Sequence, residues 1–297
     1  MRVKRWVRIS RTEAKEQIMR AVFALSALAA ILAVGLICVF LFAGGIPGMA
    51  KIGVFQFLFG KDWSPSDIPP EFGILPMIIG SLYVTAGAVL VGVPIGIFTA
   101  VFMAKVCPKR LYKLLKPAIE LLAGIPSVVY GFFGIVILVP LVRNVFGGNG
   151  SSMLTASLLL GIMILPTVIG ISESALRAVP GELYEGAVAL GASHERAVFG
   201  VVLPAAKSGV MAAVVLGIGR AIGETMAVKM VAGNQALLRL PTEFLKGVRT
   251  LTANVVIEMG YAEGLHRESL IATGVVLFVF ILVINLLFSI LNRRAAK

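Results

Sequence analysis

The stretch PGELYEGAVALGASHERAVFGVVLP, residues 180–204, lies between two long apolar runs and is too ordered for a simple connector. Pro180 suits the start of a helix. Leu183, Ala187 and Leu190 recur at helical spacing and give that helix one apolar face. The first half of the stretch therefore predicts a short amphipathic helix.

The second half predicts another helix after a tight turn. Gly191 suits the residue that follows a helix end, and Ser193 can cap a helix over about 194–202, with Pro204 beyond it. Two short helices around a glycine turn make a compact knob. Such a knob either receives force from a soluble partner or is an ordinary interfacial hairpin, and the residues alone do not separate the two.

The composition on either side of this stretch indicates an all-α integral membrane protein. The chain is 58% hydrophobic with a mean hydropathy of +0.96, and 14% of its residues are charged, against about 25% in soluble proteins. A membrane-spanning helix needs about 20 apolar residues. Six runs of that kind predict six transmembrane helices, at about 21–43, 72–104, 118–141, 153–171, 205–232 and 270–291.

Lysine and arginine give the expected orientation, because cytoplasmic loops are enriched in them. They crowd the N-terminal segment, the loop after the second run and the C-terminal tail, so we expect both termini and residues 180–204 in the cytoplasm of a cell-membrane protein. The expected organisation is a basic cytoplasmic N-terminus (1–20), a first transmembrane helix (21–43), a core (73–291) with cytoplasmic helices at 180–203, and a cytoplasmic tail (292–297).

Charged residues inside the fifth run are the main candidates for a substrate path. Arg220 and Glu224 are four residues apart, so on one helix they would share a face and could pair. A guanidinium at this depth offers paired donors to a tetrahedral oxyanion, and Thr225 adds a hydroxyl. Gly219 and Gly223 would let a neighbouring helix approach. The competing interpretation is a structural ion pair that fixes helix packing.

Glycine and proline predict irregular helices elsewhere. Gly124 and Pro126 should break the third run near its start, either to line a cavity or to form a packing kink. The Gly92–Gly96 step in the second run is a candidate for close helix contact.

Other functions find little support in the sequence. Gly60-Lys61 lacks the pattern of a phosphate-binding loop, so ATP hydrolysis would need another chain. An intramembrane enzyme would need clustered polar groups, whereas we count Glu224 as the single acidic residue in the span cores. Two histidines and two cysteines indicate neither a metal site nor a disulfide framework. A stand-alone channel or secondary transporter would leave the helix–turn–helix without a purpose.

The stretch 180–204 resembles the EAA signature of ABC-importer permeases, which reads Glu-Ala-Ala, three residues, Gly, nine residues, Ile, one residue, Leu-Pro. The positions that carry the resemblance are Glu185, Gly186, Ala187, Gly191, Val201, Leu203 and Pro204. Gly186 replaces Ala and Val201 replaces Ile. The resemblance implies a type I, MetI-like fold, with 180–203 as coupling helices that dock on a separate ATPase.

Two further segments are similar to the permeases of phosphate importers. These are GRAIGETMAV (219–228), closest to the PstC subunits with the PstA subunits second, and AGIPSVVYG (123–131). The resemblance implies phosphate import with a PstA-like permease, a PstB-like ATPase dimer that binds ATP and Mg, and an external PstS-like binding protein. It matches Arg220 and Glu224 to charged positions implicated in phosphate passage. From the residues alone, another oxyanion such as arsenate would fit the same donors.

Overall fold

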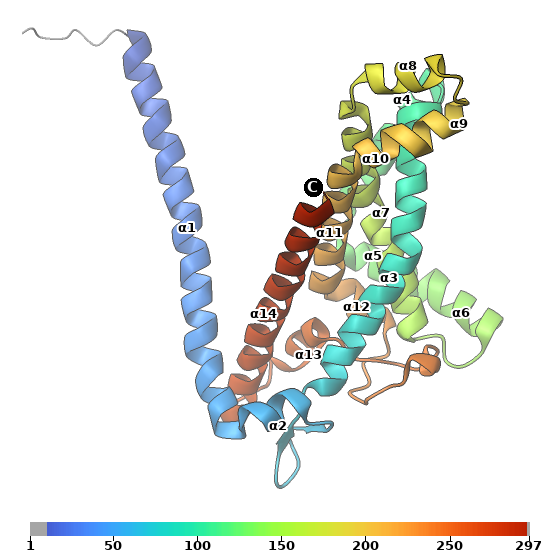
Figure 1. Cartoon of the computed structure of the whole chain (residues 1–297). Helices are drawn as coiled ribbons and strands as arrows, with labels where there is room; N and C mark the ends of the chain where they lie inside the picture. Colours follow the sequence, from blue (N-terminus) through green and yellow to red (C-terminus); the bar gives the residue numbers. More distant parts are fainter. Residues whose placement is uncertain (1–10, 296–297) are drawn as a thin grey trace, which may run out of the picture.

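The computed structural model describes residues 11–295, and in that range the chain is mainly helical, with one short two-stranded hairpin and connecting loops (Figure 1). Residues 1–10 of the expected basic N-terminus and 296–297 of the expected tail lie outside it. The first half contains α1 (Arg11–Ile52), α2 (Val54–Phe59), β1 (Trp63–Ser64), β2 (Glu71–Phe72), α3 (Leu75–Val101), η1 (Phe102–Val106), α4 (Lys109–Gly124), α5 (Ser127–Phe133), η2 (Gly134–Leu138) and α6 (Val139–Phe146). The second half contains α7 (Met153–Ala178), α8 (Gly181–Ala189), α9 (His194–Ala197), η3 (Val198–Val202), α10 (Leu203–Ala205), α11 (Lys207–Gly223), α12 (Met226–Val231), η4 (Pro241–Glu243), α13 (Leu251–Glu258) and α14 (Gly264–Ala295). β1 and β2 pair antiparallel, with Trp63 opposite Phe72.

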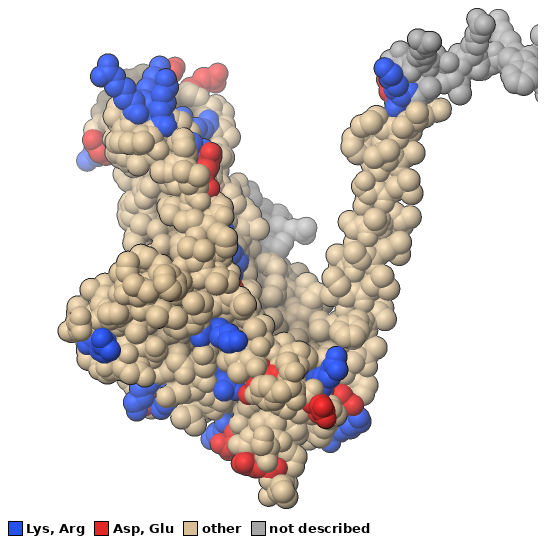
Figure 2. Space-filling model, turned by 180° about the vertical axis from the view of Figure 1, so that it is seen from behind, with Lys and Arg blue, Asp and Glu red and all other residues tan. Residues whose placement is uncertain are grey.

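Five helical segments among the described residues are long and apolar enough to cross a membrane: Lys15–Ile52, Leu75–Val106, Ser127–Phe146, Met153–Ala178 and Gly264–Leu287. A sixth arises if α11 is joined to the short helices before it, across a bend of 70°. Figure 2 shows charged side chains over α4 and its neighbours at one end of the molecule and around the hairpin at the other, with a few more on the face between them. The described chain thus agrees with the predicted six-span membrane protein.

The centre of the fold is the contact between α3 and α7, which pack side by side. Gly92 and Gly96 make it possible, because a Cβ at Gly92 would lie 2.7 Å from the carbonyl oxygen of Gly161, and one at Gly96 would lie 2.7 Å from Val168. α11 packs on the next face of α7. The predicted Gly92–Gly96 contact is confirmed, and buried apolar residues such as Ile164 fill the seam.

α1 touches the rest of the chain mainly through α14, near the end of the molecule that carries the hairpin (Figure 1). There, a Cβ at Gly45 would meet Val275 at 2.7 Å, and Lys51 forms an ion pair of 2.7 Å with Glu268. The other part of α1 stands apart with its apolar side chains exposed. The helix is also longer than the expected span 21–43, because neither Gly44-Gly45 nor Pro47 ends it.

The fourth span extends beyond the expected residue 171. α7 runs to Ala178, so Ser172–Ala178 are helical and not loop. It ends at Val179, whose φ of −65° and ψ of 128° are extended. A residue before proline is disfavoured in the helical conformation, and Pro180 follows. The last span is longer too, since α14 includes Gly264–Ser269 before the expected start at Leu270.

The third span was wrongly predicted as one run over 118–141. Two helices, α4 and α5, meet there at a break, where Ile125 and Pro126 are both extended. Ile125 precedes a proline, and Pro126 has no N–H to continue the ladder. The break itself was expected. The unexpected part is α4, which begins at Lys109 within the basic loop because Tyr112, Leu115 and Ile119 form a helical stripe against the core.

The fifth span, predicted over 205–232, is interrupted twice. The chain bends at Ala206 before α11 begins, and α11 ends at Gly223. Glu224 has an extended conformation (φ −72°, ψ 128°), and the helix resumes as α12 at Met226. Glycine weakens a helix, and the Glu224 carboxylate here binds backbone N–H groups of the next helix, which together favour the interruption.

Candidate functional site

The helix–turn–helix predicted for residues 180–204 is present at one end of the molecule, next to α4 (Figure 1). α8 is followed by Gly191 with φ of 88°, a left-handed conformation that suits glycine. Ser193 caps α9 by accepting a hydrogen bond from the backbone N–H of Arg196 at 3.4 Å. Tyr184 and His194 hydrogen-bond across the turn at 2.9 Å and fix the two helices to each other.

The second arm of this knob continues further than expected. Helical backbone runs from α9 through η3 into α10, so Pro204 lies inside the arm instead of beyond it. Ala197, Val198 and Val202 are buried against Leu176 of α7, which anchors the knob to the core.

α8 is the exposed arm of the knob, and it contains no buried residue. Leu190 at its end is 92% exposed. Of the positions that carried the EAA resemblance, Glu185, Gly186 and Ala187 lie in α8 and Gly191 follows it, whereas Leu203 and Pro204 lie in α10. Ala187 and Leu203 are half-buried, and the others are exposed. A cavity of about 400 Å³ separates α8 from α10 and α11, and its lining includes Pro180, Leu183 and Ser208. α8 therefore presents an exposed apolar and acidic surface at this end of the molecule.

Arg220 is half-buried on α11, and Nη1 donates a hydrogen bond of 3.2 Å to Thr167 Oγ1 on α7. It lies about 20 Å along α11 from Lys207, so with Lys207 at the membrane surface it would lie well inside a hydrocarbon core about 30 Å thick. The predicted pair with Glu224 is wrong. None of the ion pairs within 4.0 Å among the described residues involves Arg220.

Glu224 fails to reach Arg220 because α11 ends one residue before it. Its Oε1 instead accepts hydrogen bonds from the backbone N–H groups of Thr225 (3.1 Å) and Ala227 (3.2 Å). Its carbonyl accepts one from Thr252 Oγ1 of α13 at 3.2 Å, while Thr225 Oγ1 donates to Gly223 at 3.3 Å. The three candidate path residues thus lie around one helix break but do not form the expected cluster.

The Gly219–Gly223 step has no helix against it within the described chain. A Cβ built at Gly219 or Gly223 meets nothing within 4 Å, and the same is true at Gly124 and Gly170. The predicted role of the step in helix contact is therefore not fulfilled by this chain's own described residues. The face of α11 beside Arg220 stays uncovered.

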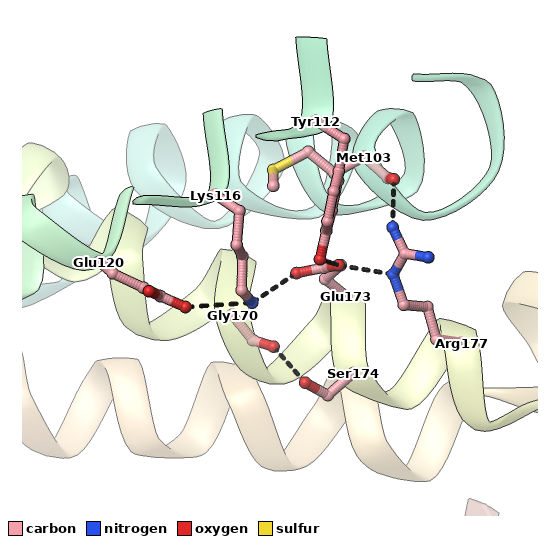
Figure 3. Close-up of polar contacts among 8 residues, drawn as sticks. All are labelled: Met103, Tyr112, Lys116, Glu120, Gly170, Glu173, Ser174 and Arg177. Carbon is pink, nitrogen blue, oxygen red and sulfur yellow. Dashed lines mark hydrogen bonds and ion pairs between the residues drawn. The ribbon is translucent and has the colours of Figure 1, made fainter. Parts of the chain in front are cut away.

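A polar cluster that the sequence did not reveal lies next to the knob (Figure 3). Glu173 of α7 is 1% exposed and accepts hydrogen bonds from Tyr112 Oη (2.8 Å), Lys116 Nζ (2.8 Å) and Arg177 Nε (2.6 Å). The hydrogen bond to the Glu173 carboxylate raises the pKa of Tyr112 and of Lys116. Glu224 is therefore not the single acidic residue in the spans. The available signal was Glu173 and Arg177 four residues apart at the end of an apolar run.

A second missed cluster lies at the opposite end. Glu258 of α13 is 6% exposed and binds Trp63 Nε1 (2.9 Å), Arg249 Nη1 (2.6 Å) and His266 Nε2 (2.9 Å). These partners come from the hairpin, the loop before α13 and α14. One carboxylate thus joins three segments that are distant in sequence.

Known proteins match this architecture. Residues 92–297 match the family model described as binding-protein-dependent transport system inner membrane component. A probable ABC transporter permease protein, YqgH of Bacillus subtilis, is 41% identical over 85% of this chain and 84% of its own length. A phosphate transport system permease protein, PstC of Mesorhizobium japonicum, is 35% identical over 86% and 83% of the two chains. A methionine ABC transporter structure, MetNI in an inward-facing conformation, aligns at a TM-score of 0.60 with 20% identity, over 75% of this chain and 96% of that one.

The fold is therefore that of MetI-like type I importer permeases. These relatives are transport subunits and not enzymes, and they work with a separate ATPase chain and a substrate-binding protein. The family match covers more than half of the sequence, so this chain belongs to the binding-protein-dependent inner membrane components, the permease subunits of ABC importers.

Proposed function

We propose that this permease is of the PstC type and carries inorganic phosphate into the cytoplasm. The 35% identity to a PstC protein supports phosphate, whereas the name of the 41% identical relative specifies no substrate. The structural observation that carries the proposal is Arg220, a half-buried guanidinium at membrane depth that has no carboxylate partner among the described residues.

An unpaired arginine at this depth favours a role in anion passage over a role in packing. Placing a charge near the bilayer centre costs about 2.5–3.5 kcal/mol on insertion scales, and a structural ion pair would offset part of that cost. The only hydrogen bond of the Arg220 side chain in the described structure goes to Thr167, so most of its donors are available. Guanidinium donors match the oxygens of a tetrahedral oxyanion. The uncovered face beside Gly219 and Gly223 gives such an anion access.

The knob at α8 and α9 is proposed as the site that docks on the ATPase. Its exposed arm carries Glu185, Gly186, Ala187 and Gly191, and Leu203-Pro204 close the second arm. In this assignment the partner ATPase dimer is PstB-like and binds ATP and Mg, the second permease is PstA-like, and a PstS-like protein delivers phosphate at the hairpin end. Glu224 and Thr225 would shape the break beside the path, and both termini would be cytoplasmic.

The experiment is phosphate uptake by the complete transporter in proteoliposomes, with ATP supplied on the ATPase side. Arg220→Gln removes the charge but keeps a polar side chain of similar length. We expect uptake to fall at least about tenfold, since charge-assisted contacts are worth about 1.5–3 kcal/mol. Arg143→Gln, at an exposed arginine of α6, is the matched control and should retain uptake.

Assembly is checked by co-purification of the ATPase and the second permease. Lost uptake with intact assembly supports Arg220 as part of the anion route. Normal uptake by Arg220→Gln contradicts that role. Wild-type transporter that imports sulfate or arsenate but not phosphate would instead assign another oxyanion to the same donors.

A further inference from the structure

α4 is held in place in an unusual way for a helix of 16 residues. It contains no buried residue, and only one stripe, with Tyr112, Leu115 and Ile119, packs partly against the core. Leu114 and Leu121 on other faces are 69% and 74% exposed. Apolar burial stabilises a helix position roughly in proportion to the area removed from water. Apolar contact alone therefore fixes α4 only weakly.

The Glu173 cluster supplies the missing attachment (Figure 3). Tyr112 and Lys116, one turn apart on α4, both donate to the Glu173 carboxylate, which is buried on α7. Arg177, one turn further along α7, donates to the same carboxylate and to the carbonyl of Met103 in η1 at 2.9 Å. Its guanidinium also lies 4.4 Å from the centre of the Tyr112 ring. The Glu173 carboxylate thus joins α4 to α7, and Arg177 extends the connection to η1, which follows α3.

The cluster lies between α8 and the break in the third span, where it can transmit movement from one to the other. Glu173 lies about two helical turns before α8, since α7 ends at Ala178 and α8 begins at Gly181. The other end of α4 is the break at Ile125 and Pro126. A displacement of α8 is passed to α7 directly through the chain, but it reaches that break only if α4 moves with α7.

We propose that Glu173 is a positioning residue for transport. It makes α4 and the end of α7 one rigid body, so that movement of α8 is carried to the broken third span. This inference rests on the proposed docking of the α8 knob on the ATPase. A buried charged hydrogen bond suits the role because it has a defined geometry and is costly to break, whereas the half-buried apolar stripe could slide.

The test measures the position of α4 relative to α8 in the complete reconstituted transporter. Cys38 and Cys107 are replaced by Ser, and spin labels are placed at Lys113→Cys on α4 and Glu182→Cys on α8, both exposed. Distance distributions are recorded without nucleotide and with ATP and vanadate. The variants are Glu173→Gln and the matched control Glu120→Gln, an exposed glutamate 3.9 Å from Lys116.

We expect the wild type and Glu120→Gln to keep one narrow distance in both nucleotide states. Glu173→Gln should broaden it and lower the number of substrate molecules imported per ATP hydrolysed by about tenfold, within the usual range of coupling between sites. Glu173→Asp, which keeps the charge, should recover part of that ratio. A purely structural role predicts instead that uptake and ATP hydrolysis fall together while the ratio is unchanged.

An unchanged distance and an unchanged ratio in Glu173→Gln would overturn the proposal. If that variant does not assemble, the Tyr112→Phe, Lys116→Met double variant opens the cluster from α4 and must give the same broadening. Failure of the functional assignment is recognised separately. Wild-type transporter without phosphate uptake would refute the substrate. Wild-type chain that does not co-purify with an ATPase would refute the docking role. The label distances are measured without phosphate, so they do not depend on the substrate.

Discussion

At the scale of single residues, two buried carboxylates hold this permease together near its two ends. Glu173 and Glu258 each bind three side-chain donors, and the donors come from segments far apart in the sequence. Removing one member of a buried charged pair leaves the other uncompensated, which costs more than the pair contributes. Both glutamates should therefore be sensitive to neutralisation, with different consequences at the two ends.

Neutralising Glu258 should destabilise the fold. Glu258→Gln leaves Arg249 without its charged partner in a cluster where the side chains are 8% and 16% exposed. We expect a loss of about 3 kcal/mol in the free energy of unfolding. Thermal unfolding in detergent, followed by the fluorescence of Trp63 after Trp6→Phe, measures it. Glu268→Gln is the control, because the Lys51–Glu268 pair is largely exposed and such pairs contribute about 0–1 kcal/mol. Equal stability losses in the two variants would contradict this account.

The Tyr112 contact of the Glu173 cluster should weaken at alkaline pH. Hydrogen bonding to Glu173 raises the pKa of Tyr112 above its ordinary value of 10.0. Because the folded pKa is the higher one, the stability that this group contributes is complete below pH 10.0 and is lost as the pH rises through the folded pKa. The difference in phenolate absorbance between wild type and Tyr112→Phe should have its titration midpoint above pH 10.0. The same difference measured in the Glu173→Gln background should have a lower midpoint. If Glu173→Gln left this midpoint unchanged, the Glu173 carboxylate would not be what raises the pKa of Tyr112.

At the scale of helices, small residues decide which faces meet. Gly92→Ala places a Cβ 2.7 Å from the Gly161 carbonyl oxygen, so α3 and α7 must separate, at about 1–3 kcal/mol for overpacking. Gly219→Ala meets nothing within 4 Å in this chain and should gain about 0.5–1 kcal/mol of helix stability. Melting temperatures of the isolated chain in detergent should thus shift in opposite directions. A stabilised Gly92→Ala would show that the α3–α7 seam is looser than described.

The helix termini show where sequence reasoning succeeds for this fold. Local chemistry predicted the turn at Gly191, the cap at Ser193 and the break beside Pro126, because each depends on the residue itself and its neighbours in the chain. It also predicted the Gly92–Gly96 contact, since only small residues allow that approach.

Other features depended on contacts that no local pattern contains. No proline follows Gly223 that would predict the helix break there. The break is fixed by hydrogen bonds of the Glu224 side chain and of Thr252 in a distant helix. That break is why Arg220 and Glu224, four residues apart, do not pair. α4 was hidden because its basic residues were interpreted only as a topology signal, although its apolar stripe has helical spacing.

At the scale of the whole molecule, the arrangement places both described chain ends on the side of the α8 knob. In Figure 1 the start of α1 and the end of α14 both point toward the end that carries α4 and α8, while the hairpin lies at the opposite end. Lysine and arginine are enriched on cytoplasmic loops. They are abundant at the N-terminus, in residues 105–116 and in the C-terminal tail, and sparser between α1 and α3. The charge pattern and the fold are therefore consistent with the proposed orientation, in which the knob lies in the cytoplasm.

Site-directed labelling tests this orientation directly. In a chain with Cys38→Ser and Cys107→Ser, a single cysteine at Ser66 in the hairpin or at Glu182 in α8 is treated with a membrane-impermeant maleimide on spheroplasts. Both positions are exposed in this chain. We expect Ser66→Cys to react in spheroplasts and Glu182→Cys to react only after the membrane is opened. The reverse pattern would place α8 outside, where no ATPase could dock on it, and would refute the coupling role together with the inward direction of transport.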